Sequence, residues 1–295
     1  MKEPLSDNKI NVVAVVGPTA SGKTKYSIEL AKKINGEIIS ADSRLVYKDM
    51  NISTAKPTLE EMSGIKHYMI DIVFPNDDYS AGLYKKQASE CIEKIYLKGK
   101  IPIIVGGTGL YTDILLRGYD LPEIPPNNEY RKQLEILNTE QLYNKLNKLD
   151  SESAIKIGKN DKKKLIRAIE IISSTSKKLS DSRSIGISQY NVKWIGMNFE
   201  RDKLYQRINE RVDKMIDDGL IDETKLLIKK YGRVYNVVNT IGYREIVQYL
   251  DGNMTLDCAV ELLKKNTRNY AKRQLTWFRK FDDIEWNVFP DKLKK

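Results

Sequence analysis

The chain has 295 residues, 41% of them hydrophobic and 31% charged, which is enough for one large or two modest domains with a substantial core. It contains no apolar stretch of about 18 residues and no apolar segment after Met1, so we expect neither a membrane span nor a secretory signal. It has only two cysteines and one histidine, without metal-like spacing, so we expect a cytoplasmic protein with neither zinc nor a disulfide framework. The net charge of +10 favours a polyanionic partner, although a general lysine bias would give the same value.

The first predicted strand, Val12–Val16, runs into a phosphate-loop motif. The motif reads Gly17-Pro18-Thr19-Ala20-Ser21-Gly22-Lys23-Thr24, and a helical pattern of apolar residues follows it. In the pattern G-x-x-x-x-G-K-[ST], backbone N–H groups and a helix N-terminus are aimed at one anion. Lys23 adds positive charge, and Thr24 offers a hydroxyl to Mg²⁺. We therefore predict a polyphosphate site, without knowing which polyphosphate binds or whether a phosphate is transferred.

Further apolar runs alternate with helical patterns as far as about residue 120. We expect strands at 37–40, 67–72 and 101–105, and a helix at 81–97. This alternation predicts an α/β fold with a parallel, doubly wound sheet. Ligands of such sheets bind at the carboxyl ends of the strands, where the polar loops 17–24, 42–47 and 106–111 are expected to meet.

Two of these loops contain candidates for chemistry. Asp42 could hold Mg²⁺ or accept a proton from a nucleophile, and the structural alternative is the N-cap of a helix. In Gly106-Gly107-Thr108-Gly109, the glycines would let a ligand approach the backbone and Thr108 would supply a hydroxyl, although an ordinary strand-to-helix turn reads the same way.

The composition changes in a proline-rich stretch at 121–128. Residues 129–174 are helical in pattern and strongly charged, residues 173–184 look like a loop, and strand character resumes at 192–198. We interpret 123–188 as a helical insertion into a core domain formed by 1–122 and 189–295. The chain after about residue 200 is expected to be helical, beginning with an apolar stripe over 202–218.

Two basic stretches could contact a phosphodiester backbone. On the insertion, Lys163, Lys164 and Arg167 share a helix face, although a lysine run is often only a solvated surface. Near the C-terminus, seven cations are interleaved with Tyr270, Trp277 and Phe278, a mixture that suits RNA with unstacked bases. These aromatic residues could also form the buried stripe of a final helix, and we expect them to pack partly while the cations face outward.

The whole chain resembles the tRNA dimethylallyltransferases (tRNA isopentenyltransferases). The phosphate loop is the least specific part of the match, and the stretches Asp42–Tyr47 and Thr267–Arg279 are the most specific. The others are Thr54–Pro57, His67–Asp71, Tyr79-Ser80, Gly106–Tyr111, Asn160-Asp161 with Arg167-Ala168, and Gly242–Glu245. In the family, Gln often stands at Leu45, Gly at Asp49 and Ser53, and Arg at Lys164. Because the chain ends at Lys295 without a zinc finger, it looks like the bacterial form.

The resemblance implies a P-loop NTPase-like core and transfer of a dimethylallyl group from dimethylallyl diphosphate to N6 of adenine 37 in tRNAs that read codons beginning with U. It implies Asp42, Thr108 and Lys23 as catalytic residues, Asp42 being the base, and a Mg²⁺ ion at Thr24. The diphosphate would be bound by Gly17, Thr19, Ala20, Ser21, Gly22, Lys23, Thr24 and Arg211. The adenine would have to leave its stack to reach the core.

The anticodon stem-loop of tRNA is the implied macromolecular partner, held by the insertion and the basic C-terminal helices of a monomer. The implied tRNA-binding residues are Asp42, Ser43, Arg44, Leu45, Thr108, Lys163, Lys164, Leu165, Ile166, Arg167, Arg268, Lys272 and Arg273. We expect the last three to lie away from the phosphate loop and to contact RNA alone.

Three other functions remain open at this point. A small-molecule phosphotransferase would turn over ATP on the same loop and would not need the basic C-terminal stretch. A non-enzymatic nucleic-acid-binding protein would not need Asp42. An adenylate isopentenyltransferase would use a free nucleotide and would lack a tRNA-gripping insertion.

Overall fold

The core of the computed structural model, which describes residues 9–119, 124, 127–180 and 188–288, is a parallel β-sheet. Its order in the described chain is β3-β2-β4-β1-β5-β6, and all neighbouring strands are parallel. The strands are β1 (Ile10–Val16), β2 (Gly36–Ser40), β3 (His67–Tyr68), β4 (Ile101–Gly106), β5 (Tyr190–Asn198) and β6 (Ile284–Val288). The predicted α/β class and the parallel sheet are confirmed.

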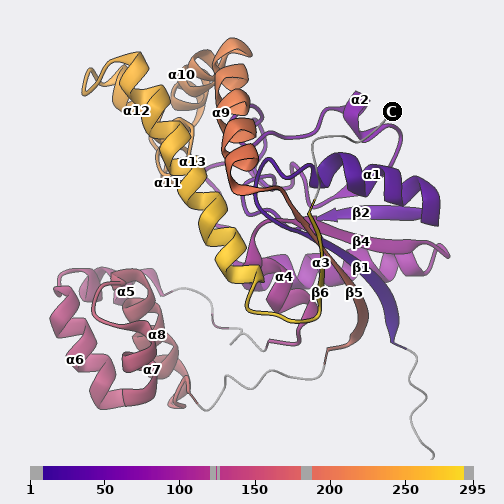
Figure 1. Ribbon diagram of the computed structural model, residues 1–295. Helices are drawn as coiled ribbons and strands as arrows, with labels where there is room; N and C mark the ends of the chain where they lie inside the picture. The colour runs from indigo at the N-terminus through magenta and orange to yellow at the C-terminus, as the bar shows by residue number, and fades with distance from the viewer. Residues whose placement is uncertain (1–8, 120–123, 125–126, 181–187, 289–295) are drawn as a thin grey trace, which may run out of the picture. The chain divides into compact units, whose positions relative to one another are not determined.

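Helices cover both faces of this sheet (Figure 1). Helix α1 (Lys23–Ile34) lies on one face, and α3 (Ala81–Tyr96) and α4 (Gly109–Leu116) lie on the other. The two faces follow from the strand order, because the chain moves from β1 out to β2 and then returns from β3 to β4, and right-handed crossovers in opposite directions place their helices on opposite sides. The apolar stripe of α1, with Ile28 and Ala31, packs on Val15, Ile38 and Ile103 of the sheet.

Two strands differ from the sequence-based expectation. Strand β3 has two residues instead of the predicted 67–72, because Met69 and Asp71 adopt positive φ angles of 62° and 56°, which end the extended run. Strand β6 was not predicted, since we expected only helix after residue 200. It pairs in parallel with β5, and its apolar Ile284 and Trp286 alternate with polar residues, which is the pattern of a half-buried strand.

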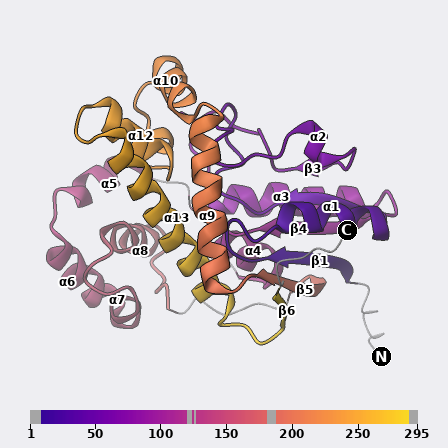
Figure 2. The ribbon, with the colours of Figure 1, turned by 45° about the horizontal axis from the view of Figure 1, so that its top comes forward.

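The C-terminal half of the core is helical, as expected. Its helices are α9 (Arg201–Asp217), α10 (Leu220–Tyr231), α11 (Tyr235–Val238), α12 (Tyr243–Leu250) and α13 (Leu256–Phe278). One further short helix, α2 (Leu59–Met62), precedes β3. Helices α9 and α13 pack side by side (Figures 1 and 2). The predicted stripe of α9 is buried at Leu204, Ile208 and Val212. No described helix combines the length and apolar composition needed to cross a bilayer.

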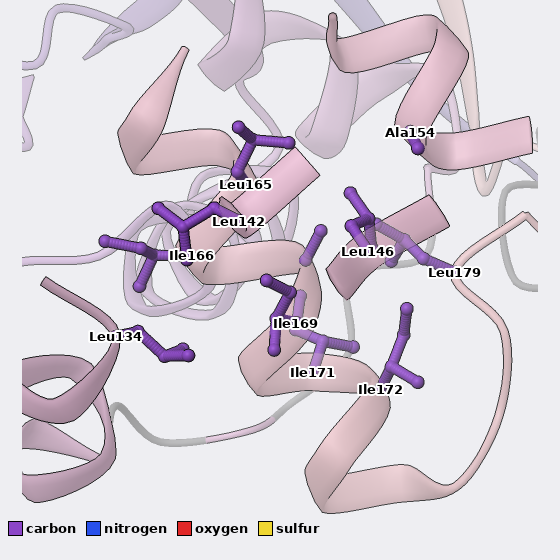
Figure 3. Packing of buried hydrophobic residues seen from close by; sticks show 11 residues of the cluster. Leu134, Leu142, Leu146, Ala154, Leu165, Ile166, Ile169, Ile171, Ile172 and Leu179 are labelled. Atoms are coloured by element: carbon purple, nitrogen blue, oxygen red, sulfur yellow. The ribbon is translucent and has the colours of Figure 1, made fainter. Parts of the chain in front are cut away.

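The chain divides into two compact units. We call residues 1–116 and 189–295 the core unit, and residues 117–188 the insertion unit. The insertion unit thus begins before the predicted residue 123, while much of the proline-rich stretch and residues 181–184 lie outside the described residues. Its helices are α5 (Asn128–Glu135), α6 (Thr139–Leu149), α7 (Ser151–Ile157) and α8 (Lys162–Thr175). They enclose a hydrophobic core of their own, which is drawn in Figure 3.

Candidate active site

The phosphate loop joins β1 to α1 in a conformation that requires its glycines. Gly17 has a φ of 148°, and a Cβ atom there would lie 2.2 Å from the carbonyl oxygen of Met197 in the neighbouring β5. Gly22, directly before α1, is left-handed with a φ of 80°. The loop therefore lies against the end of the sheet and presents the N-terminus of α1 to the space above it.

Helices α9 and α13 brace the phosphate loop from outside. Arg207 Nε donates a hydrogen bond of 2.9 Å to the carbonyl oxygen of Ala20, and Arg211 Nη1 donates one of 3.2 Å to Thr19 Oγ1. Ala20 packs in a small apolar cluster with Ile208 of α9 and Ala271 of α13. The two cations thus come from one face of α9, at a spacing of one helical turn.

Lys23 is a half-buried basic residue at the start of α1. Its Nζ donates a 2.6 Å hydrogen bond to the carbonyl oxygen of Pro18. Burial, together with the charge of Arg211, lowers the pKa of Lys23 to about 7, even though Asp42 acts in the opposite direction. The next residue, Thr24, is exposed and its side chain faces the space above the loop.

Asp42 begins a tight turn at the end of β2. Its Oδ1 accepts a hydrogen bond of 2.8 Å from the backbone N–H of Arg44, and no helix begins here, so the helix-cap alternative is wrong. Within the described chain, no protein donor bonds the second carboxylate oxygen, Oδ2. The carboxylate is therefore oriented by the backbone and keeps one oxygen for other partners.

The loop after β4 holds the Asp42 turn in place. Thr108 Oγ1 accepts a hydrogen bond of 3.1 Å from the N–H of Ser43, and the Thr108 N–H donates one of 3.2 Å to the carbonyl oxygen of Ala41. A Cβ atom at Gly106 would lie 2.1 Å from that same Ala41 oxygen. Gly106 therefore makes room for a neighbouring backbone, and Gly106 and Gly107 also line the cavity described below.

Tyr270, from α13, completes this cluster. Burial of its phenol, together with the nearby Asp42 carboxylate, raises the pKa of Tyr270 to about 12. The phenol therefore stays protonated at neutral pH and can serve as a hydrogen-bond donor.

The phosphate loop and the Asp42 turn face one cavity of about 840 Å³, which lies within the core unit. This volume is in the range of cavities that hold small-molecule ligands. The residues that bring charge to its wall come from six parts of the chain: Lys23, Lys25, Glu29, Lys32, Asp42, Arg44, Glu61, Arg207, Arg211, Arg244 and Arg273. The five arginines and three lysines outnumber the three carboxylates, so the cavity is suited to a polyanion.

The basic face of α13 divides into groups with different surroundings. Arg273 lines the cavity that the phosphate loop also lines, so the expectation that all three predicted α13 cations lie away from that loop is wrong for Arg273. Lys272 is exposed, whereas Arg268 donates a 2.6 Å hydrogen bond to Asn209 of α9. Of the aromatic residues, Phe278 is fully buried and Trp277 donates to Asp113 of α4.

The predicted tRNA-binding stretch on the insertion unit is in part structural. Leu165 and Ile166 are buried in the core of this unit, so their side chains serve packing and not RNA contact. Arg167 donates to the buried Glu170 at 2.6 Å and to the carbonyl oxygen of Ile124 at 2.9 Å. Lys164 pairs with Asp161, the N-cap of α8, and it is exposed, as is Lys163.

Comparison with known proteins decides the family. A family model described as IPP transferase matches residues 45–281. The chain belongs to the IPP transferase family. A relative named tRNA dimethylallyltransferase from Halalkalibacterium halodurans is 45% identical over 94% of this chain and 91% of its own length, and one from a Thermoanaerobacter species is 46% identical over 96% and 93%.

Solved structures give the same result. The full-length tRNA isopentenylpyrophosphate transferase of Bacillus halodurans is 45% identical, with a TM-score of 0.72 over 95% of this chain and 90% of that one. A eukaryotic dimethylallyltransferase acting on tRNA is 31% identical, with a TM-score of 0.84 over 96% of this chain and 74% of the other. The P-loop NTPase-like fold expected from the resemblance is confirmed.

Three positions where the resemblance implied a different residue have distinct surroundings. Asp49, where the family often has Gly, adopts a positive φ of 64°. Ser53, another such position, donates a 2.6 Å hydrogen bond to the carbonyl oxygen of Ile241. Leu45 lines the cavity close to Asp42 in the chain and offers an apolar surface where Gln is frequent.

Sequence analysis assigned no role to three residues that line this cavity: Arg207, Arg244 and Gln274. Arg207 could have been found, because it precedes Arg211 by one helical turn and therefore shares its face. Gln274 could not, because its partners are far away in the sequence.

Proposed function

We propose that this protein transfers the dimethylallyl group of dimethylallyl diphosphate to N6 of adenine 37, beside the anticodon of tRNAs that read codons beginning with U. Membership of the IPP transferase family supports alkyl transfer to tRNA. The single observation that carries the site assignment is that Lys23 and Arg211 line the same cavity as the Asp42 carboxylate. A diphosphate leaving group and an attacking amine could thus be held together.

The phosphate loop would bind the diphosphate of the donor. In the reaction, the bond between the allylic carbon and the diphosphate oxygen breaks, and its electron pair leaves with the diphosphate. An allylic carbon carries positive charge well, so stabilising the departing diphosphate is the main catalytic task. Lys23, Arg211 and the N–H groups at the start of α1 are fixed in place before the reaction, which is the arrangement that stabilises developing negative charge most effectively.

Asp42 would act on the acceptor. The N6 lone pair forms the new bond to the allylic carbon, and one N6 proton passes to Asp42 Oδ2, which has no protein donor in the described chain. The 2.8 Å hydrogen bond from Arg44 holds the other oxygen and keeps the carboxylate in one orientation. Thr108 holds the Asp42 turn through the N–H of Ser43, and the Tyr270 phenol lies near the carboxylate.

The residues at the start of α1 also fit a Mg²⁺ ion. The exposed Thr24 hydroxyl is a hard oxygen ligand beside the phosphate loop, and the described chain has no group of three or more acidic, histidine or cysteine side chains that could hold a metal. Mg²⁺ is commonly bound by one or two protein oxygens together with substrate phosphates. When bound, it would neutralise charge on the leaving diphosphate.

RNA would be held by exposed cations such as Lys272 on α13 and Lys163 on α8, which suit backbone contacts. Because the cavity is formed within one chain, we propose that the monomer is sufficient for the reaction.

The test is incubation with labelled dimethylallyl diphosphate, Mg²⁺ and unmodified tRNA, followed by digestion and nucleoside analysis. We expect labelled N6-isopentenyladenosine, and none from a matched transcript with guanine at position 37. Label in free adenosine monophosphate instead of tRNA would favour a nucleotide-dependent relative. ATP turnover with a small acceptor and no transfer to tRNA would favour a phosphotransferase.

A further inference from the structure

Gln274 joins the two loops that face the cavity. It lies on α13 with only 5% of its surface exposed. Its Oε1 accepts a hydrogen bond of 2.9 Å from the N–H of Thr19 in the phosphate loop, and its Nε2 donates one of 3.0 Å to the carbonyl oxygen of Gly107 after β4. One buried amide therefore spans the gap between the loop after β1 and the loop after β4.

The hydrogen bond between Gln274 and Gly107 requires a residue without a side chain at position 107. A Cβ atom on Gly107 would lie 2.1 Å from Gln274 Nε2, so any larger residue at that position would displace the amide. Gly107 immediately precedes Thr108, whose side chain binds Ser43 beside Asp42. Hydrogen bonds and the peptide link between Gly107 and Thr108 thus connect the phosphate loop through Gln274 to the turn that carries Asp42.

We propose that Gln274 is a positioning residue that sets the distance between the diphosphate and the base Asp42. The proposal rests on the function proposed above, in which the loop holds the leaving group and Asp42 receives the proton. The geometry of a transfer reaction is sensitive to this distance, since displacement by about 1 Å can cost on the order of 10²-fold in rate. Gln274 acts through the two loops and need not touch either substrate.

Glutamine is suited to this position because it has both a donor and an acceptor at its end. One end of its amide satisfies the Thr19 N–H and the other satisfies the Gly107 carbonyl, and a buried side chain lacking either group would leave a backbone partner unpaired. A glutamate can make both bonds only when it is protonated. The position therefore offers a chemical switch by which the role can be tested.

The experiment compares Gln274→Met and Gln274→Glu with the unchanged protein. Methionine keeps the length and the volume of the side chain but makes neither hydrogen bond. The matched control is the same pair of substitutions at Gln248, on α12, which hydrogen-bonds only to Asn253 in the described structure and lies outside the cavity lining. The readouts are kcat, the KM of each substrate, the Kd of inorganic pyrophosphate, and the thermal midpoint Tm.

For Gln274→Met we expect kcat per folded molecule to fall about 10- to 100-fold while the KM for tRNA changes less than about threefold. The pyrophosphate Kd should rise only modestly, because Lys23, Arg211 and α1 remain in place. A purely structural brace would lower Tm and leave kcat per folded molecule unchanged, and that result would overturn the proposal.

For Gln274→Glu we expect the ratio of its kcat to that of the unchanged protein to rise as the pH is lowered, because protonation restores the donor to Gly107. Dividing by the unchanged protein removes the pH effects that both proteins share. The charged and titratable side chains of the same cavity set the midpoint of the ratio, and they include Lys23, Arg44, Arg207, Arg211, Arg244, Arg273, Glu29, Asp42, Glu61 and the Tyr270 phenol. A ratio independent of pH would contradict the role of the donor.

Failure of this inference can be told apart from failure of the proposed function. If the unchanged protein transfers no dimethylallyl group to tRNA, the proposed function is wrong and the inference falls with it. If the unchanged protein is active and both Gln274 variants match the Gln248 controls in kcat, only the positioning role is wrong. If Gln274→Met does not fold, the ratio of kcat values for Gln274→Glu and the unchanged protein, measured against pH on folded material, tests the proposal instead.

Discussion

Lys23 shows how the phosphate loop is prepared for an anion. Burial removes water from its ammonium group, and Arg211 adds a second positive charge, so the pKa of Lys23 is lowered to about 7. A bound diphosphate supplies the missing negative charge and must raise this pKa again. The side chain therefore takes up a proton when the ligand binds above neutral pH.

This coupling predicts a pH-dependent affinity for inorganic pyrophosphate. The pKa of Lys23 is higher in the complex than in the free protein, so the contribution of its charge to pyrophosphate affinity is fully present below about pH 7. This contribution is lost as the pH rises towards the pKa of Lys23 in the complex, and the Kd rises by at most about tenfold per pH unit. Titration calorimetry from pH 6 to 9 measures it. In Lys23→Arg the guanidinium stays charged, so this part of the slope should vanish, while ionisation of the probe is common to both proteins. Equal slopes would contradict the assignment.

Asp42 is expected to matter for turnover rather than for binding. Asp42→Asn keeps an oxygen that can accept the Arg44 N–H, so the turn should survive, but the amide cannot take a proton from N6. We predict a fall in kcat of roughly 10²–10⁴-fold with a nearly unchanged Kd for tRNA. Single-turnover kinetics and a tRNA-binding titration give the two numbers. Parallel losses in both would point to a positioning role, and no loss would remove Asp42 from the chemistry.

At the scale of elements, α13 serves two sides of the molecule. Its buried residues include Ala271 and Gln274, which contact the phosphate loop, while its exposed face carries cations. Lys272 and Arg273 are neighbours in sequence, yet only Arg273 lines the cavity. One helix therefore connects the surface expected to bind RNA with the site expected to bind diphosphate.

This arrangement predicts different effects for two adjacent substitutions. Lys272→Gln should raise the KM for tRNA and reduce the salt dependence of tRNA binding by about one unit of slope or less, with the KM for dimethylallyl diphosphate unchanged. Arg273→Gln should raise the KM of the diphosphate as well, because this side chain faces the cavity. Initial rates with both substrates varied at two salt concentrations separate the cases. Identical behaviour of the two variants would show that the cavity lining does not divide their roles.

Helix α8 is held by a buried ion network. The carboxylate of Glu170 has no exposed surface, and it accepts hydrogen bonds from Arg131, Arg167 and the backbone N–H of Asn127. These donors hold the pKa of Glu170 below its usual value although burial acts against them. Arg167 is thus needed for the fold of the insertion unit before any contact with RNA is considered.

Glu170→Gln is predicted to destabilise the insertion unit. The substitution leaves two guanidinium groups without their counter-charge, and because these are about one-third exposed we expect a loss of about 1–3 kcal/mol, below the full value for a buried pair. Hydrogen exchange of 128–135 and 162–175 should speed up, while that of the β-sheet should not. The exposed Glu135→Gln on α5 is the matched control. Protection equal to that control would show that the network contributes little.

At the scale of the whole molecule, local signals predicted the sheet and the phosphate loop well. The loop lies between a strand and a helix that are adjacent in sequence, and its glycines are required by its own backbone. The role of Gln274 could not be predicted, because its partner Thr19 is 255 positions away. Strand β6 carries an alternating pattern, but it is short and follows a long helix. The side chain of Arg167 could not be told from an exposed cation, because the sequence does not show that it pairs with the buried Glu170.

The central claim is that one cavity of a single chain brings a diphosphate leaving group and a tRNA adenine together for alkyl transfer. The most direct measurement uses dimethylallyl diphosphate labelled with ¹⁴C in the allyl group and ³²P in the diphosphate. The account predicts that the ¹⁴C enters tRNA and the ³²P is released as pyrophosphate in equal amounts, without ATP consumption. Recovery of ³²P in tRNA, or ATP hydrolysis in proportion to product, would contradict it.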